Sequence, residues 1–364
     1  MDSQDQGLRE LTDRVAQARS SGQPLEIRGA GSKRFYGEAP RGEVLDMTAL
    51  SGISSYEPTE LVVTARAGTP LAHLEAALEE KGQCLPFEPP RFAAGGTVGG
   101  MVAAGLAGPA RASVGSVRDH VLGMTLLNGR GEMLSFGGQV AKNVAGYDIS
   151  RLIVGSLGIL GVVCEVSMKV LPVPAAAATL HFDCRQSEAL EKLNAWRCKP
   201  LPINASVWHD DRLYVRLSGA RAAIGEACRE LKGVRLEAGS SQQWWSSVRD
   251  QRHDFFSIAD EALQRGECLW RLSVPAATPA LELPGRQFIE WQGAQRWWRT
   301  TASAAQVRAT AAGAGGHATL MRAADKSAGV FSPLSEVLMR IHRNLKQAFD
   351  PQHIFNPGRL YAGL

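Results

Sequence analysis

A glycine-rich segment close to the start of the chain has the composition of a phosphate-binding loop. It reads Ile27-Arg28-Gly29-Ala30-Gly31-Ser32-Lys33 and follows a short strand-like stretch. Glycines leave successive backbone N–H groups uncovered by a Cβ atom, and such a nest binds anions. The Ser32 hydroxyl and the Lys33 ammonium would add donors for a pyrophosphate. Taken alone, the segment is also compatible with a plain turn.

The same loop departs from the dinucleotide fingerprint of Rossmann domains. Arg34 stands where that fingerprint has its last glycine, and neither a helical run nor a suitably placed acidic residue follows. In Rossmann domains those features hold the pyrophosphate on a helix and the ribose on a carboxylate. The sequence therefore disfavours NAD bound in the usual way.

A second glycine cluster, Gly95-Gly96-Thr97-Val98-Gly99-Gly100, follows two prolines further along the chain. Two glycine pairs around a threonine allow the backbone to pass close to a ligand, with the Thr97 hydroxyl as a donor. Small residues of this density equally permit close packing of a helix. Two more segments, residues 113–123 and 142–163, are turns beside strands when judged by residue type alone.

The elements that must position these loops form a mixed α+β pattern. Apolar residues at Leu8, Leu11, Val15 and Ala18 predict an N-terminal helix, and a second helix is predicted over 70–81 with Thr69 as its N-cap. Asn128-Gly129 predicts a hairpin turn. The strands predicted in this half are 25–28, 44–46, 61–65, 121–127, 132–136 and 161–171.

The second half has a different composition, since all eight tryptophans follow residue 195. Prolines at 172 and 174 mark the junction, which predicts domains over 1–174 and 175–364. Residues 350–364 are expected to pack back on the first domain. The elements predicted in the second domain are strands at 180–182, 205–209 and 213–218, a helix at 222–232, and helical stretches at 241–264 and 333–349.

Composition narrows the class of protein. The net charge of +4 is spread without a basic run, so it argues only weakly for nucleic acid or anionic lipid. Six cysteines form no C-x-x-C pair, which makes a metal or iron–sulfur site in this chain unexpected and favours a reduced, cytoplasmic protein. The N-terminus lacks the pattern of a signal peptide, and the apolar stretch 93–107 is too rich in glycine and alanine for a membrane span.

In their order and spacing, the four glycine-containing segments resemble the FAD-binding domain of the vanillyl-alcohol oxidase and para-cresol methylhydroxylase (PCMH) superfamily. The C-terminal stretch Asp350–Leu360 is similar to that family's last motif. The resemblance implies an α+β fold in which a two-subdomain FAD-binding domain is followed by an α+β cap domain. Within the superfamily the chain looks like the FAD-binding subunit of bacterial glycolate oxidases, GlcE-type. The segments that carry this likeness are Gly31–Gly37, Lys142–Asp148, Gly293–Trp297 and Gly315–Leu320.

The resemblance also implies roles for individual residues in binding FAD. The first loop would hold the pyrophosphate, Pro86 would contact the flavin, and the second cluster would line the diphosphate and ribityl chain. Residues 28–37 contain no histidine, the residue to which many relatives attach FAD covalently, so binding is expected to be noncovalent. The implied cofactor-binding residues are Gly29, Ala30, Gly31, Ser32, Lys33, Pro86, Gly95, Gly96, Thr97, Gly99, Gly100, Gly115, Ser116 and Val162.

Candidates for catalysis are fewer. Relatives that oxidise D-2-hydroxy acids carry a metal motif H-A-G-D-G-N-x-H, of which this chain keeps only His317, so no metal site is expected. His317 could act as a base, and Arg299 or Arg322 could clamp a carboxylate, as could Arg296. Each of these residues also fits a packing role.

The leading hypothesis is an FAD-binding subunit of a complex that oxidises glycolate, or D-lactate, to the 2-oxo acid. Electrons would pass to an iron–sulfur subunit, a second flavin subunit would be present, and the complex could touch the inner face of the cell membrane peripherally. One alternative is a self-sufficient FAD-dependent oxidase of a small 2-hydroxy acid or alcohol. Another is a non-catalytic structural subunit.

Overall fold

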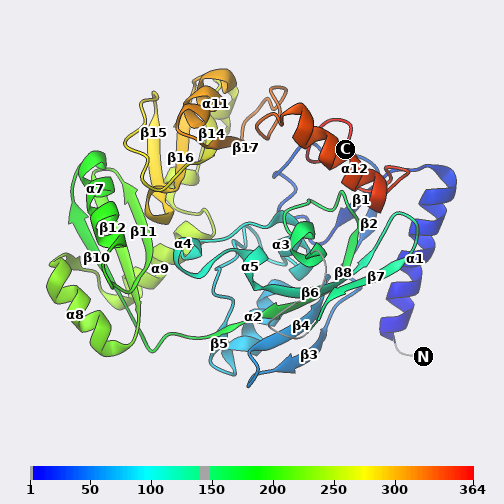
Figure 1. Cartoon of the computed structure of the whole chain (residues 1–364), viewed down its shortest axis with the longest axis horizontal. Helices are drawn as coiled ribbons and strands as arrows, with labels where there is room; N and C mark the ends of the chain where they lie inside the picture. Colours follow the sequence, from blue (N-terminus) through cyan, green and yellow to red (C-terminus); the bar gives the residue numbers. More distant parts are fainter. Residues whose placement is uncertain (1–2, 139–147) are drawn as a thin grey trace. The chain divides into compact units, whose positions relative to one another are not determined.

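The chain divides into two units, each built around its own sheet (Figure 1). The computed structural model describes residues 3–138 and 148–364, so most of the predicted motif at 142–148 lies outside the described residues. The first unit comprises Met1–Leu106, Ser116–Pro172 and Pro333–Leu364. The second comprises Ala107–Gly115 and Val173–Ser332. This division differs from the expected boundaries, because a short stretch before Ser116 lies with the second unit and residues 333–349 lie with the first.

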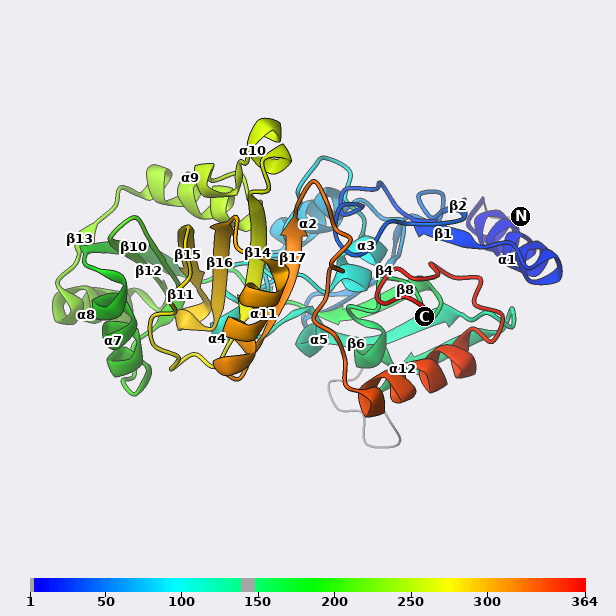
Figure 2. The ribbon, with the colours of Figure 1, turned by 90° about the horizontal axis from the view of Figure 1, so that it is seen from above.

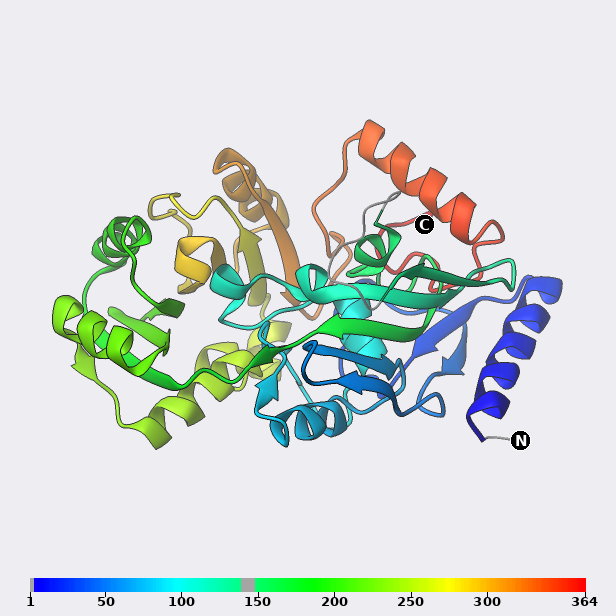
Figure 3. The same ribbon diagram turned by 60° about the horizontal axis from the view of Figure 1, so that its bottom comes forward.

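The first unit contains a five-stranded antiparallel sheet in the order β3-β4-β8-β6-β7 (Figure 3). A separate parallel pair, β1 and β2, precedes it in the chain. Helix α3 packs on β4 and β8, where Val98 and Val102 are fully buried. The bounds are α1 Ser3–Ser21, β1 Leu25–Arg28, β2 Glu43–Asp46, β3 Ile53–Glu57, β4 Val62–Arg66, α2 Leu71–Glu79, β5 Gln83–Cys84, α3 Val98–Ala104, α5 Val117–His120, β6 Val121–Leu127, β7 Met133–Gly137, α6 Ile149–Ile153, β8 Val162–Lys169, β9 Leu171–Pro172 and α12 Glu336–Phe349.

The second unit contains an eight-stranded antiparallel sheet in the order β13-β10-β12-β11-β15-β16-β14-β17 (Figure 2). One core lies under α7 and α8, and another under α11 includes Trp270 and Trp298. The bounds are α4 Arg111–Val114, β10 Ala176–Asp183, α7 Gln186–Arg197, β11 Ile203–His209, β12 Arg212–Gly219, α8 Arg221–Leu231, β13 Val234–Arg235, α9 Ala238–Arg249, η1 Asp254–Phe256, α10 Asp260–Gln264, β14 Cys268–Ser273, β15 Arg286–Glu290, η2 Trp291–Gly293, β16 Gln295–Thr300, α11 Ala304–Gly313 and β17 His317–Arg322.

Two of the predicted helices differ in the structure. Thr69 does not cap α2: its hydroxyl bonds both the N–H and the carbonyl of Gly52, and Pro70 takes the N-cap position. The stretch 241–264 is not one helix, because Gln251 adopts a left-handed conformation with φ 53° and breaks it between α9 and α10. The predicted N-terminal helix, the hairpin and the named strands are confirmed to within a few residues.

The C-terminal segment is tied to the first unit by a buried ion pair. The Lys346 ammonium, on α12, donates to Asp350 Oδ2 at 2.8 Å and to the carbonyls of Ile159 at 2.7 Å and Phe355 at 2.8 Å. Asp350 also accepts the backbone N–H groups of Ile354 and Phe355. Both side chains are fully buried, and burial lowers the pKa of Lys346 although Asp350 opposes the shift. One pair therefore joins α12, the residues around Phe355 and the loop before β8.

Breaking this pair should destabilise the chain strongly. Asp350→Ala leaves a buried ammonium without its counter-charge, and such a loss costs about 3–5 kcal/mol. Urea denaturation of the purified chain, followed by circular dichroism, measures the change in the free energy of unfolding. Arg229→Ala, which removes an exposed ion pair with Glu226 on α8, is the matched control and should change little. Equal effects of the two variants would contradict this account.

Candidate cofactor-binding site

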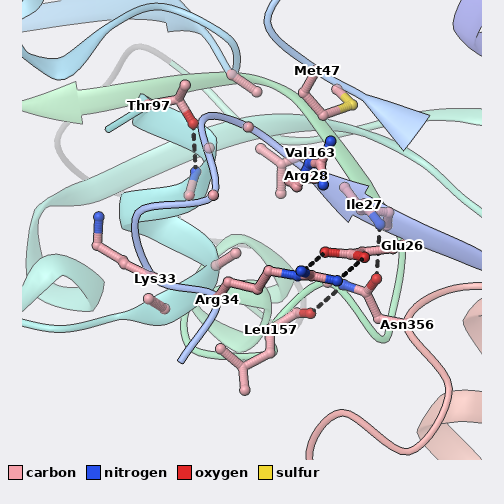
Figure 4. Close-up of a pocket in the computed structure, with 18 of the residues that line it drawn as sticks. Glu26, Ile27, Arg28, Lys33, Arg34, Met47, Thr97, Leu157, Val163 and Asn356 are labelled. Carbon is pink, nitrogen blue, oxygen red and sulfur yellow. Dashed lines mark hydrogen bonds and ion pairs between the residues drawn. The ribbon is translucent and has the colours of Figure 1, made fainter. Parts of the chain in front are cut away.

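A pocket in the first unit collects most of the residues predicted to bind a cofactor (Figure 4). The loop after β1 forms one wall and the first turns of α3 form another. The loop before β8 and the C-terminal segment complete it through Leu157, Gly158, Asn356 and Arg359. The predicted residues that line it are Gly29, Ala30, Gly31, Ser32, Lys33, Thr97, Gly99 and Gly100.

Glycines let the first loop lie directly on the start of α3. A Cβ atom on Gly29 would stand 2.3 Å from Thr97 Oγ1, and one on Gly99 would stand 2.7 Å from the Cβ of Ala67. Thr97 caps the helix, since its hydroxyl accepts the N–H of Gly100 at 3.2 Å. The glycine cluster thus permits close helix packing and also forms a pocket wall, so the two interpretations of its sequence are compatible.

Two cationic side chains of the pocket each have a buried nitrogen without a hydrogen-bond partner among the described residues. Within the described residues, the buried Lys33 Nζ has no hydrogen-bond partner and lies 5.9 Å from the centre of the Phe92 ring. Burial lowers the pKa of Lys33 to about 8. Nη1 of Arg359 is likewise buried without a hydrogen-bond partner, while its Nη2 donates to the carbonyl of Arg34. Desolvation of these cations is unfavourable, and an anion beside them would offset it.

A pyrophosphate fits this arrangement better than a neutral ligand. A Cβ atom on Gly96 would lie 3.3 Å from Ser32 Oγ and 3.7 Å from Lys33 Nζ, so bare backbone stands next to both donors. Arg34 is not part of the free positive charge, because it pairs bidentately with the buried Glu26 at 3.1 and 3.2 Å. The residues present therefore suit the diphosphate of a dinucleotide.

Asn356 holds the pocket walls together, a role that the sequence did not reveal. Its Oδ1 accepts the N–H of Ile27 at 2.8 Å, and its Nδ2 donates to the carbonyl of Leu157 at 2.6 Å (Figure 4). The backbone N–H of Asn356 donates to the carbonyl of Leu25. The C-terminal motif was recognised in the sequence, but only the fold shows that Asn356 and Arg359 reach the first loop.

The other residues predicted to contact the cofactor lie outside this pocket lining. Gly95 adjoins the loop, since a Cβ atom on it would be 3.5 Å from that of Ala30. Val162 is fully buried on β8 between the pocket-lining Gly161 and Val163. Pro86 is buried, Gly115 ends α4 with φ 90°, and Ser116 forms a capping box with Asp119.

Two of the candidate arginines for catalysis are engaged within the second unit. Arg299 donates to both carboxylate oxygens of Glu267, at 2.8 and 3.1 Å, and to the carbonyls of Phe255 and Ser257. The hydrogen bonding of Arg299 to the Glu267 carboxylate lowers the pKa of Glu267. Arg296 is fully buried and donates to carbonyls of Gly293, Thr278 and Pro279. Both guanidinium groups hold loops in place, so neither presents a fork to a substrate.

His317 and Arg322 stand at opposite ends of β17. Five residues along a strand span roughly 17 Å, so the two side chains do not converge. Burial lowers the pKa of both groups, and Arg271 adds to the shift at His317. In the part of the chain that the structure describes, no group of three or more His, Cys, Asp or Glu residues could hold a metal ion.

Comparison with known proteins places this geometry in a family. Residues 7–137 match the FAD binding domain family. The chain is 49% identical over 354 residues to glycolate oxidase subunit GlcE of Escherichia coli (strain K12), covering 97% of both chains. This chain belongs to the GlcE family of glycolate oxidase subunits. It is an FAD-binding oxidoreductase subunit, as its sequence indicates.

More distant relatives match parts of the chain or its fold. Glycolate oxidase subunit GlcD of Bacillus subtilis (strain 168) is 33% identical over 159 residues, which are 43% of this chain and 34% of that protein. An alkyldihydroxyacetonephosphate synthase has a similar fold, with a TM-score of 0.64 at 14% sequence identity over 97% of this chain and 76% of that one. The expected α+β FAD-binding fold is confirmed. Among the described residues, no helix combines the length and apolar character needed to cross a membrane.

Adding one methyl group to the first loop should weaken FAD binding. Gly29→Ala places its Cβ against Thr97. A steric overlap of this kind costs about 1–3 kcal/mol, and the loop must move away from α3 to relieve it. We expect the Kd for FAD, measured by fluorescence titration, to rise roughly tenfold or more. Gly225→Ala adds the same group to α8 where no atom lies within 4 Å, and it should leave the Kd unchanged. Similar Kd values for both variants would count against the loop as a binding wall.

The affinity for FAD should depend on pH through Lys33. Below pH 8 the ammonium is charged with and without FAD, so the affinity is constant. Above the pKa of about 8 in the free protein, binding must take up a proton, so the affinity falls by up to about tenfold per pH unit. Titrations from acidic to alkaline pH measure this slope. Lys33→Met should bind more weakly and lose the slope; a slope that persists would assign it to another group.

Proposed function

We propose that this chain carries noncovalently bound FAD as one subunit of a glycolate oxidase complex. In the complex, glycolate or D-lactate is oxidised to the 2-oxo acid and electrons continue to an iron–sulfur subunit. The observation that carries the proposal is the pocket with two buried cationic donors, Lys33 and Arg359, in a chain that is similar over 97% of its length to a glycolate oxidase subunit.

Different residues are proposed to contact different parts of the cofactor. Backbone N–H groups from Gly29 to Gly31, with Ser32 and Lys33, hold the diphosphate, and Arg359 adds a second cation. Thr97, Gly99 and Gly100 line the neighbouring wall, and Val162 contributes backbone groups. When bound, FAD supplies the two-electron acceptor for oxidation of the hydroxy acid.

We infer that turnover depends on partner subunits. Arg299 is held by Glu267 and two carbonyls, and His317 and Arg322 lie at opposite ends of one strand, so these candidates do not form a substrate site together. A GlcD-like flavin subunit is therefore proposed to supply the groups that act on the substrate. The sequence has no C-x-x-C pair, and the proposal accordingly assigns the iron–sulfur centres to another subunit. Contact with the membrane, if the complex makes it, would be peripheral and through the complex.

Flavin spectroscopy on the chain alone and on the co-expressed complex tests this proposal. The purified chain should show flavin absorbance bands after addition of FAD, and acid precipitation should release the FAD into the supernatant. Anaerobic glycolate should bleach the flavin in the complex and leave the isolated chain unchanged. Lack of flavin bands in the chain would overturn the proposal. Bleaching of the chain alone would instead establish a self-sufficient oxidase, and an active complex whose chain binds no FAD would establish a structural subunit.

A further inference from the structure

The second unit contains a cavity that the proposed function does not use. Its volume is about 420 Å³. Small-molecule sites have volumes of roughly 300–1,000 Å³, so the cavity is large enough for a ligand. It is bordered by α4, by the end of α7 with the segment that leads into β11, by the loop after β14, and by η2. Figure 1 shows α4 beside β11.

Three cationic side chains line this cavity: Arg111 on α4, Arg197 at the end of α7, and Lys199 just beyond it. All three are exposed. Lys199 pairs with Glu230 at 2.7 Å, so its charge is largely balanced. Among the described residues, no acidic side chain belongs to the lining. A recess lined by charges of one sign concentrates ions of the opposite sign, so this cavity favours an anion.

The guanidinium of Arg111 is held by an aromatic ring. It lies over the ring of Trp291, 4.4 Å from the ring centre. Such stacking uses the flat face of the guanidinium, whereas its N–H groups point outward in the plane. The ring of Trp291 is itself fixed, because its indole N–H donates to the carbonyl of Gly108 at 3.0 Å. A planar fork held in this way matches the oxygens of a carboxylate or a phosphate.

One wall of the cavity is a strained turn. Trp291 and Gln292 both adopt the left-handed conformation, with φ 52° and 55°. Bulky residues adopt it rarely, and it persists only where the surroundings enforce it, as at ligand-binding sites. The Gln292 N–H donates to Ser206 Oγ at 3.0 Å, and the Gln292 carbonyl accepts a hydrogen bond from Arg197 Nη2 at 2.9 Å. Arg197 is thus tied to the turn on which Arg111 stacks, so both cations border the same space.

The rest of the lining is mainly apolar. It includes the side chains of Trp196, Leu201 and Ile203, which pack against one core of the unit. An apolar surface of this kind favours the hydrocarbon body of a ligand. The two- and three-carbon acids of the proposed reaction would leave most of the volume empty. The cavity therefore suits a larger organic acid.

We propose that this cavity is a second ligand site, which binds a small organic anion with a ring-sized apolar body and a doubly charged acidic end. Arg111 and Arg197 bind the acidic end, and Trp196, Leu201 and Ile203 contact the body. The inference goes beyond the proposed function, because the cavity lies within the second unit and uses none of the residues proposed to bind FAD.

Isothermal titration calorimetry of the full chain with phenyl phosphate and with phthalate tests the site. At least one of the two should bind with a Kd of about 1 mM or below, and Arg111→Ala/Arg197→Ala should raise that Kd at least tenfold. The two probes distinguish a phosphate from a pair of carboxylates as the acidic end. Benzyl alcohol, which has the ring without the charge, should not bind. The matched control is Arg229→Ala, which removes an exposed arginine of the same unit outside the cavity and should leave the Kd unchanged.

Lys33→Met separates this cavity from the FAD pocket, which also contains cationic groups. Binding of the probe should persist in Lys33→Met and in the wild-type chain saturated with FAD. Loss of binding in either case would assign the probe to the FAD pocket and overturn the second site. So would an unchanged Kd in the double variant, or a lack of binding by both probes. Arg111→Gln and Arg197→Gln, each of which should raise the Kd, serve if circular dichroism shows that the double variant does not fold. Failure of the chain to bind FAD would overturn the proposed function alone, because the comparison with Lys33→Met does not need FAD.

Discussion

The ammonium of Lys346 is removed from water and surrounded by one carboxylate and two backbone carbonyls. A buried charge of this kind is tolerated only when its hydrogen bonds are all made, so the segments that supply the acceptors are fixed together. They are the end of α12, the residues around Phe355 and the loop that contains Ile159. From that point Asn356 reaches the backbone of β1 and of Leu157. The geometry of the FAD-binding loop thus depends on residues at the far end of the chain.

The cations of the pocket differ from Lys346 in how their hydrogen bonds are satisfied. Around Lys346 every donor has an acceptor, whereas Lys33 Nζ and one Arg359 nitrogen are buried without one in the described structure. The depressed pKa of Lys33 follows from this desolvation. The fold holds these cations in place although their desolvation is unfavourable. A diphosphate that binds beside them offsets this desolvation and so gains affinity. In the first unit Lys346 therefore stabilises the fold, whereas Lys33 and Arg359 are the cations that favour ligand binding.

The sequence predicted the local elements well, since helical spacing at Leu8 and Leu11 and the Asn128-Gly129 turn act over a few residues. It also identified the first glycine loop, because Gly29 and Gly31 are required by close approach and by a positive φ. It was wrong about the cap at Thr69, whose hydroxyl bonds Gly52 instead. It could not show that Arg359 faces Lys33's pocket or that Arg299 is neutralised by Glu267, because those pairings join residues distant in sequence. Residue type marked these arginines as candidates, and only packing separates a ligand-facing one from a structural one.

The first unit is assembled from three separate stretches of chain, with most of the second unit inserted before the last of them. During synthesis the β1 loop and α3 are made before the second unit, and Lys346, Asp350 and Asn356 are made after it. The five strands of the first unit's sheet precede Val173–Ser332, the main part of the second unit, and can pair before it is made, whereas the pocket lacks its C-terminal anchor until the segment after the second unit is synthesised. A chain that stops short of Asn356 would leave the loop after β1 without its anchor. The FAD-binding pocket is in this way coupled to the segment that follows the second unit in the chain.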